Sequence, residues 1–107
     1  MELETEIEAV RTTFNAFIQS VKAGDFSSYL NLYDPEVAAG VSEDLFARNS
    51  DRAKAHAFEF DLDRIQFDGR FATVSFTVKP GDGATEHEDQ SEITLVRNDE
   101  HWMLYET

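Results

Sequence analysis

The spacing of the apolar residues changes near residue 55, and this change limits most strongly the folds that the chain can adopt. Before residue 55, apolar residues recur every three or four positions, which is the period of a helix with one buried face. After it, apolar and polar residues alternate, as in strands of a sheet with one buried face. Helices followed by strands predict an α+β fold, with the helices gathered on one face of an antiparallel sheet.

A long first helix is the clearest element of the helical half. Its apolar residues form one stripe at spacings of three and four: Leu3, Ile7, Val10, Phe14, Phe17, Ile18 and Val21. Gly24 can take the left-handed conformation that ends a helix. We therefore expect a helix over residues 3–21, with the sheet packed against its stripe.

Shorter elements follow the long helix. Asp25 has the side chain of an N-cap for a second helix that ends near Tyr33. Residues 36–40 are expected to form a short strand. Ser42 is expected to cap a third helix, with a break at residues 49–51.

The second half of the chain predicts a bent meander of four strands. Its first strand carries apolar residues in one phase and then in the opposite phase: Phe58, Phe60 and Leu62, then Ile65 and Phe67. Such a change predicts a β-bulge near residues 63–64. Asp68-Gly69 is a strong hairpin signal, and further turns are expected at 80–83 and 98–100.

The charge composition of the chain limits the classes of partner that it can bind. The 107 residues, taken as one domain over residues 1–107, carry 22 acidic and nine Lys and Arg residues, a formal charge of −13. Nucleic acids and anionic membrane surfaces are disfavoured, because both are bound through Lys and Arg. The chain has no cysteine, and its start, MELETEIE, lacks the apolar segment of a signal peptide. No apolar run reaches the length of a membrane span, so we expect a cytoplasmic protein.

Two short motifs carry a family resemblance. GD-x₇-YD spans the predicted second helix from Gly24 to Asp34, and EHWMLYET forms the aromatic last strand. With the order of the elements, these motifs resemble the nuclear-transport-factor-2-like, or SnoaL-like, superfamily. The resemblance implies a cystatin-like cone, in which a curved antiparallel sheet wraps around a long N-terminal helix with two shorter helices and leaves a pocket at the wide end.

The resemblance leaves the reaction open. Members include ketosteroid isomerases, scytalone dehydratase, polyketide cyclases and limonene epoxide hydrolases, and others carry ligands or assemble complexes. This chain is short for the superfamily, and Phe14 and Phe17 stand on the helix where the isomerases place a catalytic tyrosine, so isomerase roles are not transferred. The resemblance also implies a homodimer through the sheet, where Thr73, Ser75 and Thr77 offer a weakly polar outer face.

Strand parity suggests one candidate catalytic set. If Ile93 faces the core, Asp89 and His87 share its face, and His56 shares the parity of Phe58 on the first strand. A carboxylate that orients an imidazole is a minimal general acid–base pair. The alternative is that these polar residues mark the end of a strand that has left the core.

Tyr29 and Tyr33 form a second candidate set, because residues four apart share one helix face. The Tyr33 hydroxyl could donate a hydrogen bond to a developing oxyanion. The alternative is that both rings pack in the core. Asp34 precedes Pro35 and is better explained as the start of a turn.

Two functions from different classes are consistent with this sequence. The first is a homodimeric binding or assembly module whose pocket holds a small apolar ligand. The second is a cofactor-free isomerase, dehydratase or cyclase that uses His87, Asp89 and Tyr33 in acid–base chemistry. The expected pocket-lining residues are Phe14, Phe17, Tyr29, Tyr33, His56, Phe58, Phe60 and Trp102. We expect no metal site, since the histidines form no close-spaced ligand motif.

Overall fold

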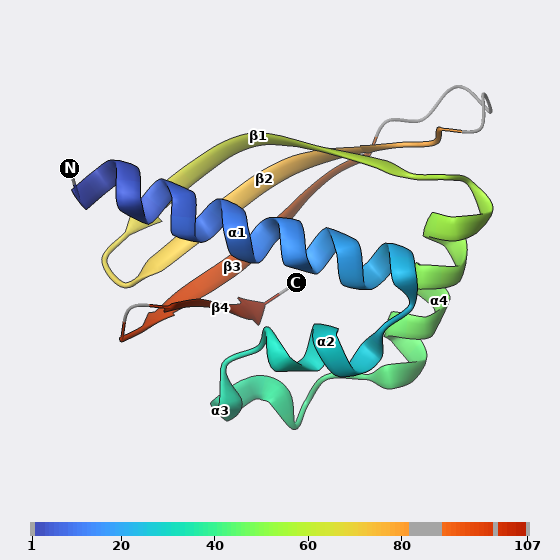
Figure 1. Ribbon diagram of the computed structural model, residues 1–107, viewed down its shortest axis with the longest axis horizontal. Helices are drawn as coiled ribbons and strands as arrows, with labels where there is room; N and C mark the ends of the chain where they lie inside the picture. The colour runs from blue at the N-terminus through green and yellow to red at the C-terminus, as the bar shows by residue number, and fades with distance from the viewer. Residues whose placement is uncertain (1, 82–88, 100, 107) are drawn as a thin grey trace.

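The computed structural model describes residues 2–81, 89–99 and 101–106, which form four helices and a four-stranded antiparallel sheet (Figure 1). The sheet has the order β1-β2-β3-β4, so each strand pairs with the next in sequence. The elements are α1 (Glu2–Ala23), α2 (Phe26–Asn31), α3 (Pro35–Ala38), α4 (Glu43–Ala55), β1 (Glu59–Asp68), β2 (Phe71–Lys79), β3 (Asp89–Asn98) and β4 (His101–Glu106). The predicted α+β class is confirmed.

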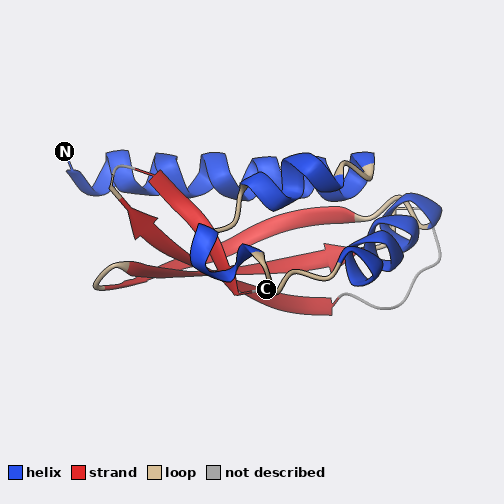
Figure 2. Ribbon diagram, turned by 90° about the horizontal axis from the view of Figure 1, so that it is seen from below, coloured by secondary structure: helices blue, strands red, loops and turns tan. Residues whose placement is uncertain are grey.

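Helix α1 lies along one face of the sheet, and the core fills the space between them (Figure 2). Four residues of its stripe are buried, with Val10 fully inaccessible and Phe14 2% exposed; the other two are Phe17 and Val21. The Phe14 ring packs 5.2 Å, between centroids, from Phe76 on β2. The Thr13 hydroxyl donates a 2.7 Å hydrogen bond to the carbonyl oxygen of Trp102, which fixes the helix to β4. Among the described helices, none has the length and apolarity needed to cross a membrane.

A bulge bends β1, as the change of phase predicts. The register between β1 and β2 shifts between Leu62 and Arg64, so the residue between them has no partner on β2. An unpaired residue of this kind kinks its strand and increases the local twist. The predicted hairpin is also confirmed, because Asp68 pairs with Phe71 across a turn in which Gly69 has a φ of 62°. The turns expected at 80–83 and 98–100 extend into residues 82–83 and 100, which lie outside the described ranges.

The segment expected to be a strand at residues 36–40 is helical instead. Pro35 occupies the first turn of α3, where its missing N–H and fixed φ are tolerated. Asp34 is the N-cap, and its side chain accepts a 2.8 Å hydrogen bond from the backbone N–H of Glu36. Sequence reasoning treated the proline only as the end of α2, although it also begins the next helix. The described fold therefore has three shorter helices rather than two.

The expected break at residues 49–51 is also absent, because α4 runs without interruption to Ala55. The predicted cap is confirmed, since the Ser42 hydroxyl accepts from the backbone N–H of Leu45. Ser50, which lies at the expected break, is 1% exposed. Its hydroxyl donates a 2.6 Å hydrogen bond to the carbonyl oxygen of Val21 near the end of α1. A residue with weak helix propensity is thus retained mid-helix because it joins two helices.

Replacement of Ser50 by Ala should lower the free energy of unfolding by about 0.5–1.5 kcal/mol, because it removes a buried hydrogen bond to the Val21 carbonyl, which keeps only its 3.3 Å bond from the Gly24 N–H. Urea unfolding followed by circular dichroism measures the change. Ser27→Ala, at an exposed position on α2, is the matched control and should change stability little. Equal stabilities for the two variants would contradict a structural role for the Ser50 hydroxyl.

Candidate functional site

A cavity of about 380 Å³, which we call the main cavity, opens at the end of the fold where α1 finishes. The apolar stripe of α1 does not extend beyond this point, and α4 crosses the end of the sheet instead (Figure 1). The wall of the cavity is mainly apolar and aromatic: Phe17, Val21, Tyr29, Leu45, Phe46, Ala53, Phe58, Phe60, Phe76, Val78 and Ile93. Its polar and charged residues are Asn49, Arg52, Asp89, Ser91 and Glu92.

The strand register explains how the sheet side of this cavity is built. Phe60 pairs with Val78, which pairs with Asp89, so these three residues form one row across β1, β2 and β3. In the adjacent inward-facing row, Phe76 pairs with Ser91. The wall therefore changes from aromatic on β1 to polar on β3.

A second cavity of about 260 Å³ lies on the other side of Tyr29. Four residues line both cavities and so form the wall between them: Tyr29, Leu45, Phe46 and Asn49. Tyr33 lines only the second cavity. The Tyr29 and Tyr33 hydroxyls lie 2.8 Å apart in a hydrogen bond, and both residues are buried. The face-sharing predicted from their spacing is thus present, with the two hydroxyls bonded to each other.

Capping of α2 holds Tyr29 in place. The Asp25 side chain accepts hydrogen bonds from the hydroxyl of Ser28, at 2.7 Å, and from its backbone N–H, at 3.1 Å. The hydroxyl bond and then the backbone bond hold the pKa of the Asp25 carboxyl below its ordinary value, because both favour the charged form. The Tyr29 ring then packs 4.4 Å, between centroids, from Phe46 on α4.

The Tyr33-Asp34 pair joins the helices to the end of β4. The backbone N–H of Asp34 donates a 2.9 Å hydrogen bond to the carbonyl oxygen of Leu104, and the N–H of Leu104 donates to Leu32. The Asp34 carboxylate is the cap of α3 described above and is 6% exposed. Asp34 therefore has a structural role that accounts for its position.

The structure distributes the expected pocket residues over three places. Four of them line the main cavity: Phe17, Tyr29, Phe58 and Phe60. Tyr33 lines the second cavity. Phe14 and Trp102 are buried in the core and line neither cavity; Trp102 packs against Phe67 with a centroid separation of 5.7 Å.

His56 lies apart from the arrangement expected from strand parity. His56 is the C-cap of α4 and is exposed, with its ring stacked 5.8 Å, between centroids, from that of Phe58. It does not continue β1, because Ala57 has a φ of 49° and interrupts the extended backbone. His87 lies outside the described residues, so its pairing with Asp89 stays a prediction. Among the described residues, no group of three or more His, Asp or Glu side chains could hold a metal ion.

Sequence reasoning missed the contribution of α4. Asn49, Arg52 and Ala53 all line the main cavity, but the break expected at 49–51 hid their common helix. The available signal was the spacing of Phe46, Asn49 and Ala53, which are three and four residues apart.

Comparison with known proteins adds information on the fold. No protein-family model matches the chain, and no curated protein matches it significantly. Among solved structures, a candidate dehydratase of the NTF2-like family from Streptomyces avermitilis is 18% identical, with 97% of each chain covered and a TM-score of 0.65. A candidate NTF2-like transpeptidase from Campylobacter jejuni is 14% identical, with 85% of this chain and 92% of that chain covered and a TM-score of 0.62.

A de novo designed protein with a curved β-sheet is also similar, with 10% identity, 94% and 86% coverage of this chain and the designed one, and a TM-score of 0.57. These similarities show that the chain has the NTF2-like, cystatin-like α+β fold, as its sequence motifs indicate. At such low identities they define no reaction.

A double-mutant cycle on Tyr29→Phe and Tyr33→Phe should give a coupling energy of about 0.5–1.5 kcal/mol, because the first substitution already removes the hydrogen bond that the second would break. Urea unfolding of the four proteins measures it. Strictly additive effects would show that the bond between the hydroxyls contributes nothing to stability.

Proposed function

We propose that the chain binds a small molecule with an apolar ring body in the main cavity. The observation that carries this proposal is the separation of the lining into an aromatic wall and a group of polar residues from α4 and β3. Ligand sites are commonly cavities of about 300–1,000 Å³ with apolar walls and a few placed polar groups. The cavity volume of about 380 Å³ lies at the small end of that range, which favours a ligand of one or two rings.

The degree of burial of the wall supports this proposal. Phe58, Phe60 and Val78 are only partly buried, although each faces the helices. A ligand ring seated against them would remove the remaining apolar surface from water, which is favourable by about 25 cal/mol for each Å². The same rings would be fully covered if the end of the cone were packed shut.

The Ser91→Phe variant should abolish binding of a neutral aromatic probe, 2-naphthol, because Ser91 lines the cavity and a phenyl ring there would fill it. Amide chemical-shift changes in a ¹H–¹⁵N titration measure binding. The control is Thr73→Phe, on the opposite face of β2, which should bind the probe as the parent does.

In the parent protein, we expect the shifts to cluster on α4 and on the cavity-facing parts of β1 and β3. Failure of 2-naphthol to bind, or binding that Ser91→Phe leaves unchanged, would contradict the proposed site. Thermal unfolding by circular dichroism establishes that both variants are folded.

Catalysis is a second candidate function, favoured by one observation: Asp89 and Tyr29 line the same cavity. A carboxylate and a phenol at one cavity are the elements of proton abstraction beside a carbonyl. Tyr33, which we expected as the donor, reaches this cavity only through its hydrogen bond to Tyr29. The geometry thus supports binding more directly than turnover.

A homodimer through the outer face of the sheet is part of this proposal. The Thr77 hydroxyl on that face donates a 2.6 Å hydrogen bond to Asp63, and the Ser75 hydroxyl lies 3.5 Å from Glu92. The face is therefore more acidic than the run of Thr73, Ser75 and Thr77 indicates. Two copies in contact there would bring carboxylates together, so pairing is opposed by charge at low salt.

Association should accordingly strengthen as salt rises from about 0.05 M to about 1 M, because the screening length falls to about 3 Å at the higher value. Sedimentation equilibrium at micromolar protein measures the dimer fraction. The Asp63→Asn/Glu92→Gln variant should dimerise at low salt already, whereas Glu43→Gln/Asp44→Asn on α4 should not. A parent protein that remains monomeric at every salt concentration contradicts the dimer.

A further inference from the structure

We infer that the ligand of the main cavity carries a carboxylate on its apolar ring body, and that Lys22 and Arg52 bind this carboxylate at the cavity mouth. This inference rests on the proposed function and specifies the class of ligand.

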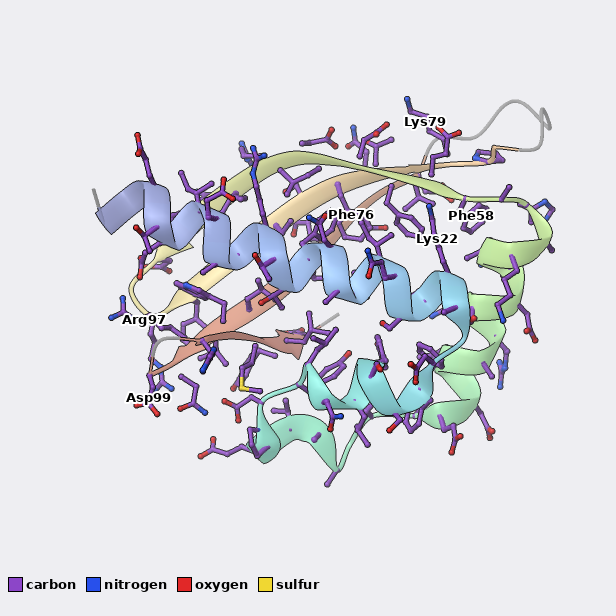
Figure 3. All side chains as sticks on the ribbon, in the orientation of Figure 1. Lys22, Phe58, Phe76, Lys79, Arg97 and Asp99 are labelled. Atoms are coloured by element: carbon purple, nitrogen blue, oxygen red, sulfur yellow. The ribbon has the colours of Figure 1, made fainter. Side chains whose placement is uncertain are left out.

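Two cations lie over the aromatic rings of the first strand that line the cavity. The ammonium of Lys22, in the last turn of α1, lies 5.9 Å from the ring centroid of Phe60. The guanidinium of Arg52, in the last turn of α4, lies 6.0 Å from the ring centroid of Phe58. Both rings line the cavity, and Arg52 does so itself. Figure 3 shows the Lys22 side chain extending from the end of α1 toward β1.

Neither cation forms an ion pair with a carboxylate of the described residues. The ion pairs found there join Lys79 to Asp61 and Arg97 to Glu6. The chain has 22 acidic residues and only nine Lys and Arg, so carboxylates are not scarce. A guanidinium over an aromatic face is held in position while its N–H donors stay directed outward in the plane of the group. The arrangement therefore leaves positive charge available at the edge of the apolar wall.

Helix electrostatics alone does not account for this placement. Cations in the last turn stabilise the negative end of the helix dipole, and α1 and α4 both have them. Lys54 shows where such a side chain goes without a cavity, since its ammonium packs against Gly24 at the end of α1. Lys22 and Arg52 lie instead over the two rings of β1.

The opposite side of the mouth is acidic and fixes the orientation of the ligand. Asp89 lies in the same row as Phe60 but two strands away, about 10 Å across the sheet. Asp89 would repel a carboxylate placed on the β3 side of the mouth. The formal charge of −13 repels anions from most of the surface, so preferential binding of an anion requires these local cations.

Three probes of similar size and different charge test the inference: 2-naphthoate, neutral 2-naphthamide and cationic 2-naphthylmethylammonium. Isothermal titration calorimetry at about 0.05 M salt should show 2-naphthoate binding at least about fivefold more tightly than 2-naphthamide, because opposite charges a few ångströms apart attract appreciably even in a partly hydrated site. The Lys22→Gln/Arg52→Gln variant should lose this preference and still bind 2-naphthamide.

The control variant, Arg11→Gln/Arg70→Gln, removes the same charge elsewhere and should keep the preference. Arg11 lies on the same side of α1 three turns before Lys22, about 16 Å away, and Arg70 lies in the turn between β1 and β2. Circular dichroism verifies the fold of both variants.

Equal affinity for 2-naphthoate and 2-naphthamide, or tighter binding of the ammonium probe, would overturn the inference and leave the proposed function standing. If the control variant also lost the preference for 2-naphthoate over 2-naphthamide, the inference would be overturned, because the preference would then depend on the net charge of the protein and not on Lys22 and Arg52. If none of the three probes binds the parent protein, the proposed function fails and the inference fails with it.

Discussion

The packing of α1 against the bent sheet is the interaction on which the rest of the structure depends. The helix buries one stripe, and the inward-facing residues of β2 and β3 bury another against it, with Val74 and Leu95 both completely inaccessible. The bulge between Leu62 and Arg64 bends β1, so the edge of the sheet curves relative to the straight helix. A straight helix and a curved sheet cannot remain in contact along their whole length. The main cavity lies at the end where they separate.

Helix α4 makes this separation a cavity rather than an open edge. The hydrogen bond from Ser50 to the Val21 carbonyl fixes its middle to the end of α1. Phe46, one turn earlier, is buried against the rings of Tyr29 and Phe26. These contacts hold α4 across the open end without filling it, because the residues that it contributes to the cavity wall include small or polar ones such as Asn49 and Ala53. The volume that remains is set by side-chain size along one helix face.

The structural features that could be predicted from sequence are those for which a local residue pattern is compatible with only one backbone arrangement. Alternation along β2 has to place Ala72, Val74 and Phe76 on one face, and the change of phase on β1 has to be absorbed by a bulge. The structural role of Pro35 was ambiguous, because a proline that ends one helix can also stand in the first turn of the next. Ser50 was ambiguous for a similar reason, since its low helix propensity is offset by a partner 29 positions away in sequence. His56 was misplaced because the left-handed backbone at Ala57 gives no signal in an alanine.

The candidate site is less predictable than the fold because it depends on where elements end. A designed protein with a curved sheet and two natural proteins described as a candidate transpeptidase and a candidate dehydratase have the same architecture, although they are only 10–18% identical to this chain. Backbone shape thus provides the concavity, and the chemistry has to come from the few side chains at its mouth. Here the polar and charged side chains of the cavity wall come from α4 on one side and from the start of β3 on the other. Substitutions at these ends can change the charge of the mouth while leaving the buried stripes unaltered. In a chain of formal charge −13, basic residues in the last turns of α1 and α4 would give the mouth a local charge opposite in sign to the net charge.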